Sequence, residues 1–326
     1  MSEMRGRSSD TALAAPQGTA CDLCQSEEAV DTLFTAKDWE YFVEGEWTLA
    51  QCRRCDYYWM NPCPPKEVLP SFYPPTYSAF TADSVMGLLF RLHFWLDARR
   101  VQKMIGPRGR VLDVGCGSGG WLQAMAKRGG WELYGVELNS KAAAHARGLG
   151  FKVQEGDLSS AVLEPESFDL IRMGHVIEHV PDPVDALCRA WKLLRPGGVL
   201  FAETPNIDCW DFHLFGRYWG ALHFPRHVKF FTEPTLRRVC RMAGFSDPEI
   251  MPRIRTVGWS TAIQNWAVDR LGLKVPSHGR VSWYPLLIGL CLPFTIAQAL
   301  VSRPATLAFV ARKPMHAPQE ASRSNL

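Results

Sequence analysis

The sequence has little excess charge. Its 326 residues carry 36 Lys and Arg against 33 Asp and Glu, a formal net charge of +3. Such slight basicity gives no argument for a nucleic-acid partner, and we expect none. The first twenty residues also lack the apolar run of a secretory signal, so we expect a cytoplasmic protein. The polar ends, 1–20 and 313–326, are expected to be disordered.

Cysteine is scarce for a disulfide-stabilised protein, with ten in the chain. Internal repeats and low-complexity tracts are also missing. Hydrophobic residues make up 47% and charged residues 21%, which is the balance of a folded globular protein. The length fits one α/β domain with an accessory module.

Strand-like and helix-like segments alternate between residues 85 and 255. The strand-like runs are 110–115, 131–138, 151–157, 168–174 and 197–205. This alternation predicts a parallel sheet with helices on both faces, and right-handed crossovers make it doubly wound. Such sheets bind ligands beyond the carboxyl ends of their strands, where we expect the chemistry.

A glycine-rich turn follows the first of these strands. Asp113, Gly115, Gly117 and Gly119 form the pattern Asp-x-Gly-x-Gly-x-Gly. The pattern differs from the Gly-x-Gly-x-x-Gly of dinucleotide-binding domains, although a generic NAD-binding domain remains the alternative. A carboxylate so close to the turn repels a pyrophosphate and favours a cationic ligand such as a sulfonium.

Acidic residues also end the next two strands. Glu137 lies about 20 residues beyond the turn, where a carboxylate can accept both hydroxyls of a ribose. Asp157 can accept a hydrogen bond from an adenine amino group, and Leu158 can cover the ring. Helix capping explains each acid singly, but it does not explain acids at three successive strand ends.

The segments VLDVGCGSGG, YGVELN, GDL, FDLIRMGHVIEHVPDP and LLRPGGVLFAETPN resemble, in this order, class I S-adenosylmethionine (SAM)-dependent methyltransferases. The resemblance covers roughly residues 85–312. It implies an α/β, Rossmann-like, seven-stranded doubly wound sheet with an antiparallel final hairpin. The implied SAM contacts are Asp113, Gly115, Cys116, Gly117, Glu137, Leu138, Asp157, Leu158, Met173 and Gly174. Among them, Met173 and Gly174 would line the sulfonium side, and Cys116 is interpreted as packing.

Two Cys-x-x-Cys pairs stand near the start of the chain. Cys21 and Cys24 are separated by 27 residues from Cys52 and Cys55. This spacing predicts a structural four-thiolate Zn²⁺ site with no open position, against the alternative of four unrelated thiols. Residues 21–80 would then be a small zinc-binding module. The segment resembles the N-terminal module of some bacterial methyltransferases of sugar and surface-polysaccharide metabolism.

Aromatic residues and histidines are dense in the loop at about 205–231, which is expected to face the transferred methyl group. Its stretch WGALHFPRHVKFFT resembles the Trp-Gly-(four residues)-Pro-Arg-His stretch of related methyltransferases. The candidate general bases are His175, His179, His223 and His227, each of which could instead be structural. Arg226 could bind an acceptor carboxylate or phosphate, or pair with Glu178 or Glu203.

The longest apolar run, 281–302, has 22 residues without a charge and lies in an insertion at about 256–302. Its length is nominally enough to span a bilayer, but Pro285, Gly289 and Pro293 weaken that interpretation. The other interpretations are a buried helical pair, a homodimer contact, or a helix at 283–301 lying on a membrane surface.

We therefore expect SAM-dependent methylation of a small-molecule acceptor, foremost a sugar or glycan intermediate, free or lipid-linked. The alternatives are O-methylation of a quinone or hydrophobic phenol, and an inactive scaffold that binds through its zinc ribbon. The fourth strand lacks the Asn-Pro-Pro-Tyr type motif for a flipped base, which argues against nucleic acid. The expected location is the cytoplasm, or the periphery of the inner face of the membrane.

Overall fold

The computed structural model describes residues 20–27, 29–74, 85–254, 257–276, 279–301 and 303–315. Most of the two polar ends for which disorder is predicted, 1–19 and 316–326, lie outside the described residues.

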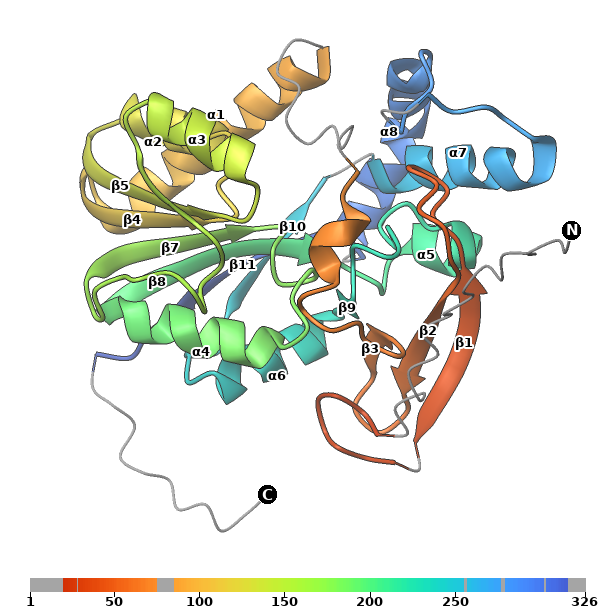
Figure 1. The fold of residues 1–326 in the computed structure, drawn as a ribbon, viewed down its shortest axis with the longest axis horizontal. Coiled ribbons are helices and arrows are strands. Elements are labelled where there is room, and N and C mark those ends of the chain that lie inside the picture. Colours follow the sequence, from red (N-terminus) through yellow and green to blue (C-terminus); the bar gives the residue numbers. More distant parts are fainter. Residues whose placement is uncertain are drawn as a thin grey trace, which may run out of the picture.

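A seven-stranded sheet forms the centre of the molecule, in the order β10-β11-β8-β7-β4-β5-β6 (Figure 1). Its strands are β4 (Arg108–Val114), β5 (Gly130–Glu137), β6 (Lys152–Glu155), β7 (Phe168–Gly174), β8 (Leu194–Pro205), β10 (Glu249–Arg253) and β11 (Thr306–Arg312). The strands from β8 to β6 are parallel, whereas β11 is antiparallel to both β8 and β10. This is the predicted Rossmann-like sheet, with the strand order reversing at β4.

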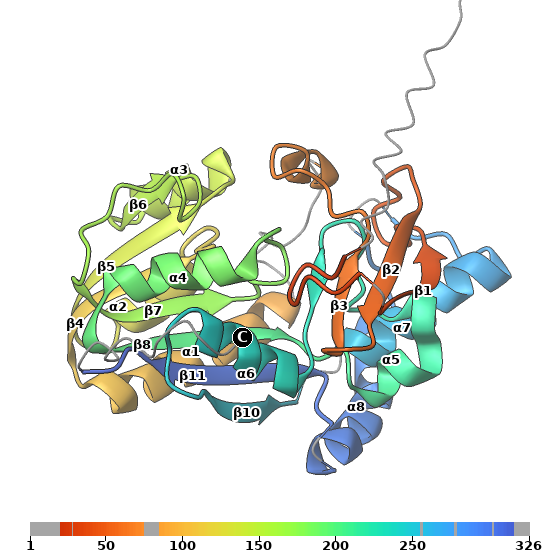
Figure 2. The same cartoon turned by 90° about the horizontal axis from the view of Figure 1, so that it is seen from below.

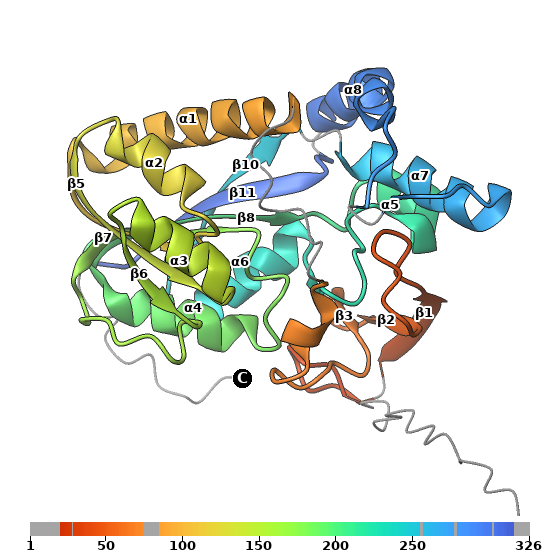
Figure 3. The same ribbon diagram turned by 45° about the horizontal axis from the view of Figure 1, so that its top comes forward.

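Helices cover both faces of this sheet (Figure 3). One face packs against α1 (Val85–Ile105), α2 (Gly120–Ala126) and α3 (Ser140–Gly148), and the other against α4 (Pro183–Leu193) and α6 (Glu233–Met242). Local sequence fixes where these helices begin. Asn139 and Asp182 accept hydrogen bonds from the first turns of α3 and α4, and Thr232 forms a capping box at α6.

The paired cysteines belong to a second, smaller sheet. It consists of β1 (Val30–Ala36), β2 (Trp47–Cys52), β3 (Tyr57–Met60) and β9 (Lys229–Phe230), all antiparallel. The last of these strands comes from the loop that follows β8. The N-terminal segment and the histidine-rich loop therefore share one sheet, beside the carboxyl edge of the larger one (Figure 2).

The insertion between β10 and β11 is a pair of helices, α7 (Val257–Leu271) and α8 (Tyr284–Leu300). They pack through the stacked rings of Trp259 and Phe294, and the Tyr284 hydroxyl lies 2.6 Å from Thr261 Oγ1. One side of α8 stays exposed. In the described part of the chain, no helix is long and apolar enough to cross a membrane.

Candidate cofactor and acceptor site

The glycine-rich turn joins β4 to α2 at the point where the strand order reverses. Gly115, Gly117 and Gly119 have φ values of 68°, 55° and 86°, which L side chains rarely adopt. A Cβ atom on Gly115 would lie 2.9 Å from Val176, and one on Gly119 would lie 3.2 Å from Ala146. The turn therefore requires glycine and leaves its backbone open to close approach by a ligand.

Glu137 ends the neighbouring strand β5, and both of its oxygens are held by the backbone. The amide of Gly117 donates to Oε2 and that of Asn139 donates to Oε1, each at 2.8 Å. Burial raises the pKa of Glu137, which these amides partly offset. Each carboxylate oxygen keeps a further lone pair for a ribose hydroxyl. The adjacent Leu138 is 64% exposed, a large apolar side chain that the core leaves uncovered.

Asp157 follows β6 and is ionised near neutral pH. Its Oδ1 accepts from the amide and hydroxyl of Ser159, and its Oδ2 lies 2.5 Å from Lys66 Nζ. Burial raises the pKa, but Lys66 and Ser159 outweigh it and lower the pKa of Asp157 to about 2. The half-buried Leu158 lies next to it. A carboxylate and an apolar side chain at this edge suit an adenine.

Asp113 is fully buried in β4 and pairs with Arg172, whose Nη1 donates to Oδ1 at 2.8 Å. Burial raises the pKa of Asp113, while the Arg172 charge lowers it. The other oxygen, Oδ2, has no hydrogen-bond partner among the described residues. A buried carboxylate oxygen without a partner suits a cationic ligand, because leaving it alone is costly.

Three other predicted cofactor residues, Gly174, Cys116 and Met173, differ in how deeply they are buried. Gly174 ends β7 and is half-buried, so its backbone is accessible at the edge. Cys116 is buried, and a Cβ atom on Gly135 would clash with its sulfur, so it is a packing residue. The side chain of Met173 is fully buried in the core. Whether Met173 contacts the cofactor stays a prediction.

The turn after β7 holds two of the candidate bases. His175 has a positive φ of 57°, and its Nδ1 lies 2.9 Å from Oε1 of Glu178. Glu178 is buried, which raises its pKa, but His175 outweighs this and the net pKa is lowered. Strained backbone of this kind is common at active sites. The Glu178 carboxylate therefore fixes the orientation of the His175 ring.

His179 and His227 lie against each other, with ring centroids 4.5 Å apart. The Nδ1 of His179 lies 3.0 Å from the carbonyl of Arg226, and that of His227 lies 2.7 Å from the carbonyl of Ala221. A carbonyl only accepts, so both Nδ1 atoms carry the proton and both Nε2 atoms carry the lone pair. Burial lowers the pKa of His179 to about 4, and burial also lowers the pKa of His227 well below its usual value.

His223 and Arg226 both have partners within the chain. His223 donates from Nδ1 to Glu40, and its Nε2 accepts from Nε of Arg226 at 2.9 Å. Both ring nitrogens are occupied, so His223 has no lone pair with which to act as a base. Both Nη atoms of Arg226 bind the carboxylate of Asp38 at 2.8 Å. The carboxylate that pairs with Arg226 is thus Asp38, and whether Arg226 also binds an acceptor stays a prediction.

The N-terminal segment supplies residues that sequence analysis missed. Asp38 and Glu40 hold Arg226 and His223, and the hydroxyl of Tyr73 lies 2.9 Å from Nδ1 of His179. About 180 positions separate Glu40 from His223. No spacing rule connects such distant residues, so no signal in the sequence indicated that this segment packs against the histidine-rich loop.

The four paired cysteines come together at one end of the small sheet. The sulfurs of Cys21 and Cys55 are 3.6 Å apart, as are those of Cys24 and Cys52, and all four lie within 4.8 Å. A tetrahedron with Zn–S bonds of about 2.3 Å has sulfurs about 3.8 Å apart. The distances fit a four-thiolate Zn²⁺ site and are too long for disulfides.

Two further groups of side chains bring ligand atoms within 4.8 Å of one another: Glu178 with His179 and His227, and His93 with Asp97 and Glu203. In both groups, carboxylates lie beside histidines. Burial, together with Glu203, raises the pKa of Asp97 to about 6. The donors of both groups could hold a metal ion or simply bind one another.

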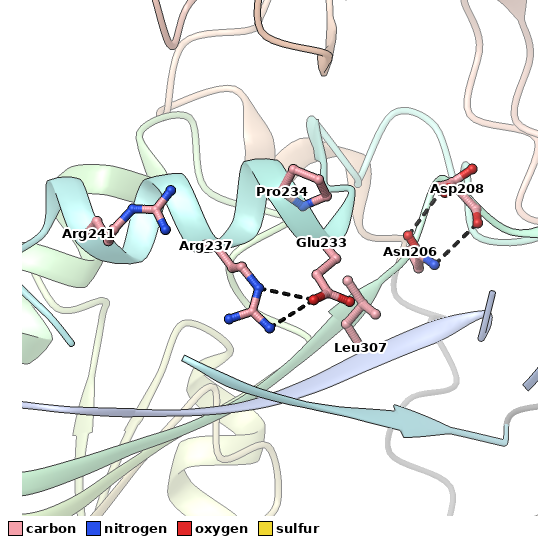
Figure 4. A pocket seen from close by; sticks show the side chains of 7 residues that line it. All are labelled: Asn206, Asp208, Glu233, Pro234, Arg237, Arg241 and Leu307. Atoms are coloured by element: carbon pink, nitrogen blue, oxygen red, sulfur yellow. Dashed lines mark hydrogen bonds and ion pairs between the residues drawn. The ribbon is translucent and has the colours of Figure 1, made fainter. Parts of the chain in front are cut away.

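A surface hollow lies apart from these residues, between α6 and the segment after β8 (Figure 4). Its arginines are paired, Arg237 with Glu233 and Asp247, and Arg241 with Asp247. None of the predicted site residues lines it. The glycine turn and the three acids instead define a nucleoside-binding doubly wound domain, with a histidine-lined wall at its carboxyl edge.

Comparisons with known proteins agree with this class. Residues 91–249 match a methyltransferase domain family. The chain is 34% identical over 170 residues to the ubiquinone biosynthesis O-methyltransferase of Aromatoleum aromaticum, covering 48% of this chain and 70% of that protein. The corresponding enzyme of Neisseria meningitidis serogroup A is 33% identical over 151 residues, covering 41% and 63%.

A solved structure shows the same fold at 18% identity. Phosphoethanolamine N-methyltransferase 2 of Haemonchus contortus, in complex with SAM, superposes with a TM-score of 0.51 over 87% of this chain and 69% of that one. The chain belongs to the class I SAM-dependent methyltransferases. It is thus an enzyme whose cofactor is SAM. Which residues contact SAM stays a prediction, which the glycine turn, Glu137 and the unpartnered oxygen of Asp113 fit.

Proposed function

We propose that this enzyme methylates a hydroxyl oxygen of a small hydrophobic phenol or quinol, with His179 as the general base. The observation that carries the proposal is the neutral His179 ring, held through Nδ1 just beyond β7. Two relatives that resemble this chain are named ubiquinone biosynthesis O-methyltransferases, which supports the acceptor class.

SAM, when bound, supplies a methyl group on a positively charged sulfur, which an aligned nucleophile displaces. Gly115, Gly117 and Glu137 would hold it with its methyl group toward the end of β7. The chain must then bring the acceptor oxygen into line and remove its proton. The histidine wall lies at this edge, because His175 directly follows β7 and His179 lies four residues further along the chain.

The proton would pass from the acceptor hydroxyl to Nε2 of His179. The carbonyl of Arg226 fixes the tautomer, so Nε2 carries a lone pair at neutral pH. The cation that forms is stabilised by the nearby Glu178 carboxylate, which raises the pKa of His179 against its burial. Neutral imidazole directed at a hydroxyl is the usual arrangement for general base catalysis near neutral pH.

This base favours a phenol over an alcohol. A phenolic hydroxyl has a pKa of about 10, as in tyrosine, whereas the hydroxyl of water lies near 15.7 and sugar hydroxyls resemble it more closely. A histidine with a lowered pKa is a weak base, so it can accept a proton from a phenolic hydroxyl far more readily than from a sugar hydroxyl. Arg226 was the residue predicted to bind a carboxylate or phosphate of the acceptor, and it is bound to Asp38. This pairing also disfavours the expected sugar or glycan acceptor.

We also propose that α8 rests on a lipid surface, which would suit an apolar acceptor. The helix has no charged residue, and large apolar side chains are exposed on it: Leu286, Leu290, Leu292, Phe294, Ile296 and Leu300. Trp283 is exposed at its beginning, and aromatic residues favour the interfacial region of membranes. Flotation with anionic liposomes should carry the protein upward, and the variant Leu286→Ser/Leu290→Ser, which leaves the Trp259–Phe294 contact intact, should remain in the dense fraction. Wild-type protein that stays there would refute this contact.

The acceptor is tested with methyl-labelled SAM and two panels, prenylated catechols and nucleotide sugars. We expect label in the catechols. His179→Gln should lower kcat by roughly 10²- to 10⁴-fold with little change in the KM for SAM. The matched control is His213→Gln, an exposed histidine on α5 (Trp210–Phe215). Label only in the sugars would refute the acceptor class, and an active His179→Gln variant would refute the base.

A further inference from the structure

The segment 61–74, which we call the strap, leaves the small sheet after β3 and includes the short helix η1 (Leu69–Phe72). Its first residue is held in place, because the amide of Asn61 donates to the carbonyl of Thr48 at 2.9 Å. From there the strap leans away from the small sheet toward α3 (Figure 2). It touches the larger domain at two separate places.

The first contact is on the adenine side of the proposed cofactor site. The ammonium group of Lys66 lies 2.5 Å from Oδ2 of Asp157 and 2.5 Å from the hydroxyl of Ser159. These residues belong to the loop that follows β6, where Asp157 and Leu158 are predicted to hold the adenine. Lys66 is thereby joined to the acid that would recognise the cofactor base.

The second contact is on the acceptor side. The hydroxyl of Tyr73 lies 2.9 Å from His179, and Nη1 of Arg226 donates to the carbonyl of Phe72 at 3.2 Å. Arg226 is buried, and its pair with Asp38 anchors this end. The two contacts of the strap thus lie on opposite ends of the proposed SAM site, one near the adenine and one near the transferred methyl group.

The two contacts differ in strength. The Lys66 side chain is 49% exposed, and the neighbouring Pro65, Glu67 and Pro70 are exposed as well. Exposed ion pairs contribute little to stability and are screened by salt, so this contact opens easily. The Tyr73 end is held by buried groups and stays closed. Because the strap is held at Asn61 and again at Tyr73, the exposed part around Lys66 can lift away while both ends stay in place.

We propose that the strap is a lid over the SAM site, which opens on the Lys66 side to admit SAM and to release the demethylated product. The Lys66–Asp157 pair is the latch that keeps the lid closed. This inference rests on the cofactor site proposed above. In physical terms, a latch changes the rates of entry and exit together, because it contributes to the barrier rather than to the contacts of the bound molecule.

The test is stopped-flow measurement of SAM and product binding to the full chain, with Lys66→Met. We expect both the association and dissociation rates to rise roughly 3- to 10-fold, with Kd within about twofold of wild type. Wild-type rates should also rise with NaCl, whereas those of Lys66→Met should not. The control is Lys152→Met, which removes an exposed lysine that pairs with Glu132 instead.

Unchanged rates in Lys66→Met, or a dissociation rate that rises alone with a matching loss of affinity, would overturn the lid. The second result would mean that Lys66 merely contributes to the bound state. Absence of SAM binding by the wild-type chain would instead overturn the cofactor site on which the lid rests. The two failures are therefore distinguishable.

Discussion

The pair of Asp38 and Arg226 should be the strongest single link between the N-terminal segment and the catalytic domain. Both Nη atoms of the guanidinium bind the carboxylate at 2.8 Å, and the two side chains are 0% and 1% exposed. Further acceptors of Arg226 include His223 and the carbonyls of Phe72 and Phe224. None of these carries a negative charge.

Replacing Asp38 with Ala removes the carboxylate that binds both Nη atoms of the buried guanidinium. Breaking a buried pair in this way costs about 3–5 kcal/mol, because the surviving charge stays desolvated. For a chain of 326 residues, each kcal/mol lowers Tm by about 1.5 °C. We therefore expect Tm to fall by about 4–7 °C in a thermal unfolding experiment followed by circular dichroism.

The variant Asp38→Leu/Arg226→Met separates the cost of a lone charge from the loss of packing. Removing both charges avoids the desolvation penalty, so it should recover most of the lost stability. The exposed pair of Asp185 and Arg189 on α4 is the matched control, and Asp185→Ala should shift Tm little. A drop below about 1 kcal/mol for Asp38→Ala would show that the pair is not buried as described.

Two further predictions concern acid stability and zinc. Burial lowers the pKa of His179, His223 and His227 below the unfolded value near 6.5, so the unfolded chain binds more protons as pH falls. Unfolding free energy should therefore decrease from pH 6.5 towards 4, by up to about 1.4 kcal/mol per pH unit for each histidine. Urea unfolding should show a shallower slope for His227→Gln, and an equal slope would contradict the assignment. For zinc, the purified chain should contain one ion by elemental analysis, and Cys52→Ser should lose it and lower Tm. A wild-type chain that contains no zinc and has the same Tm as Cys52→Ser would exclude the site. The control variant Cys188→Ser should keep the zinc ion.

Much of the larger domain could be predicted from local sequence. Short apolar runs in the sequence predict the parallel strands, and the glycine-rich turn at 115–119 follows the first of these runs. Asp182, Pro183 and Thr232 mark where α4 and α6 begin. The identity of the insertion as two helices was one of several interpretations of a charge-free run, and periodicity alone could not choose among them.

The contacts between the N-terminal segment and the histidine-rich loop could not be predicted, because they join residues that lie far apart in the sequence. The sequence places His223 and Arg226 in a loop expected to face the methyl group. Only the fold shows that His223 is hydrogen-bonded to Glu40 and that Arg226 is paired with Asp38. A charged residue in a cleft and one in a buried pair look the same in a sequence.

The most direct test of the cofactor site is calorimetric titration of SAM into the full chain and into Glu137→Gln. Asp113→Ala is a poorer choice, because it would leave the buried Arg172 unpaired. The matched control is Glu132→Gln, an exposed residue near the opposite end of β5. Loss of a charged acceptor for ribose hydroxyls should cost about 1.5–3 kcal/mol, a roughly 10- to 150-fold weaker Kd. Micromolar binding by wild type and Glu132→Gln, with this loss in a folded Glu137→Gln, is the predicted result. Equal affinity for all three proteins would contradict the site.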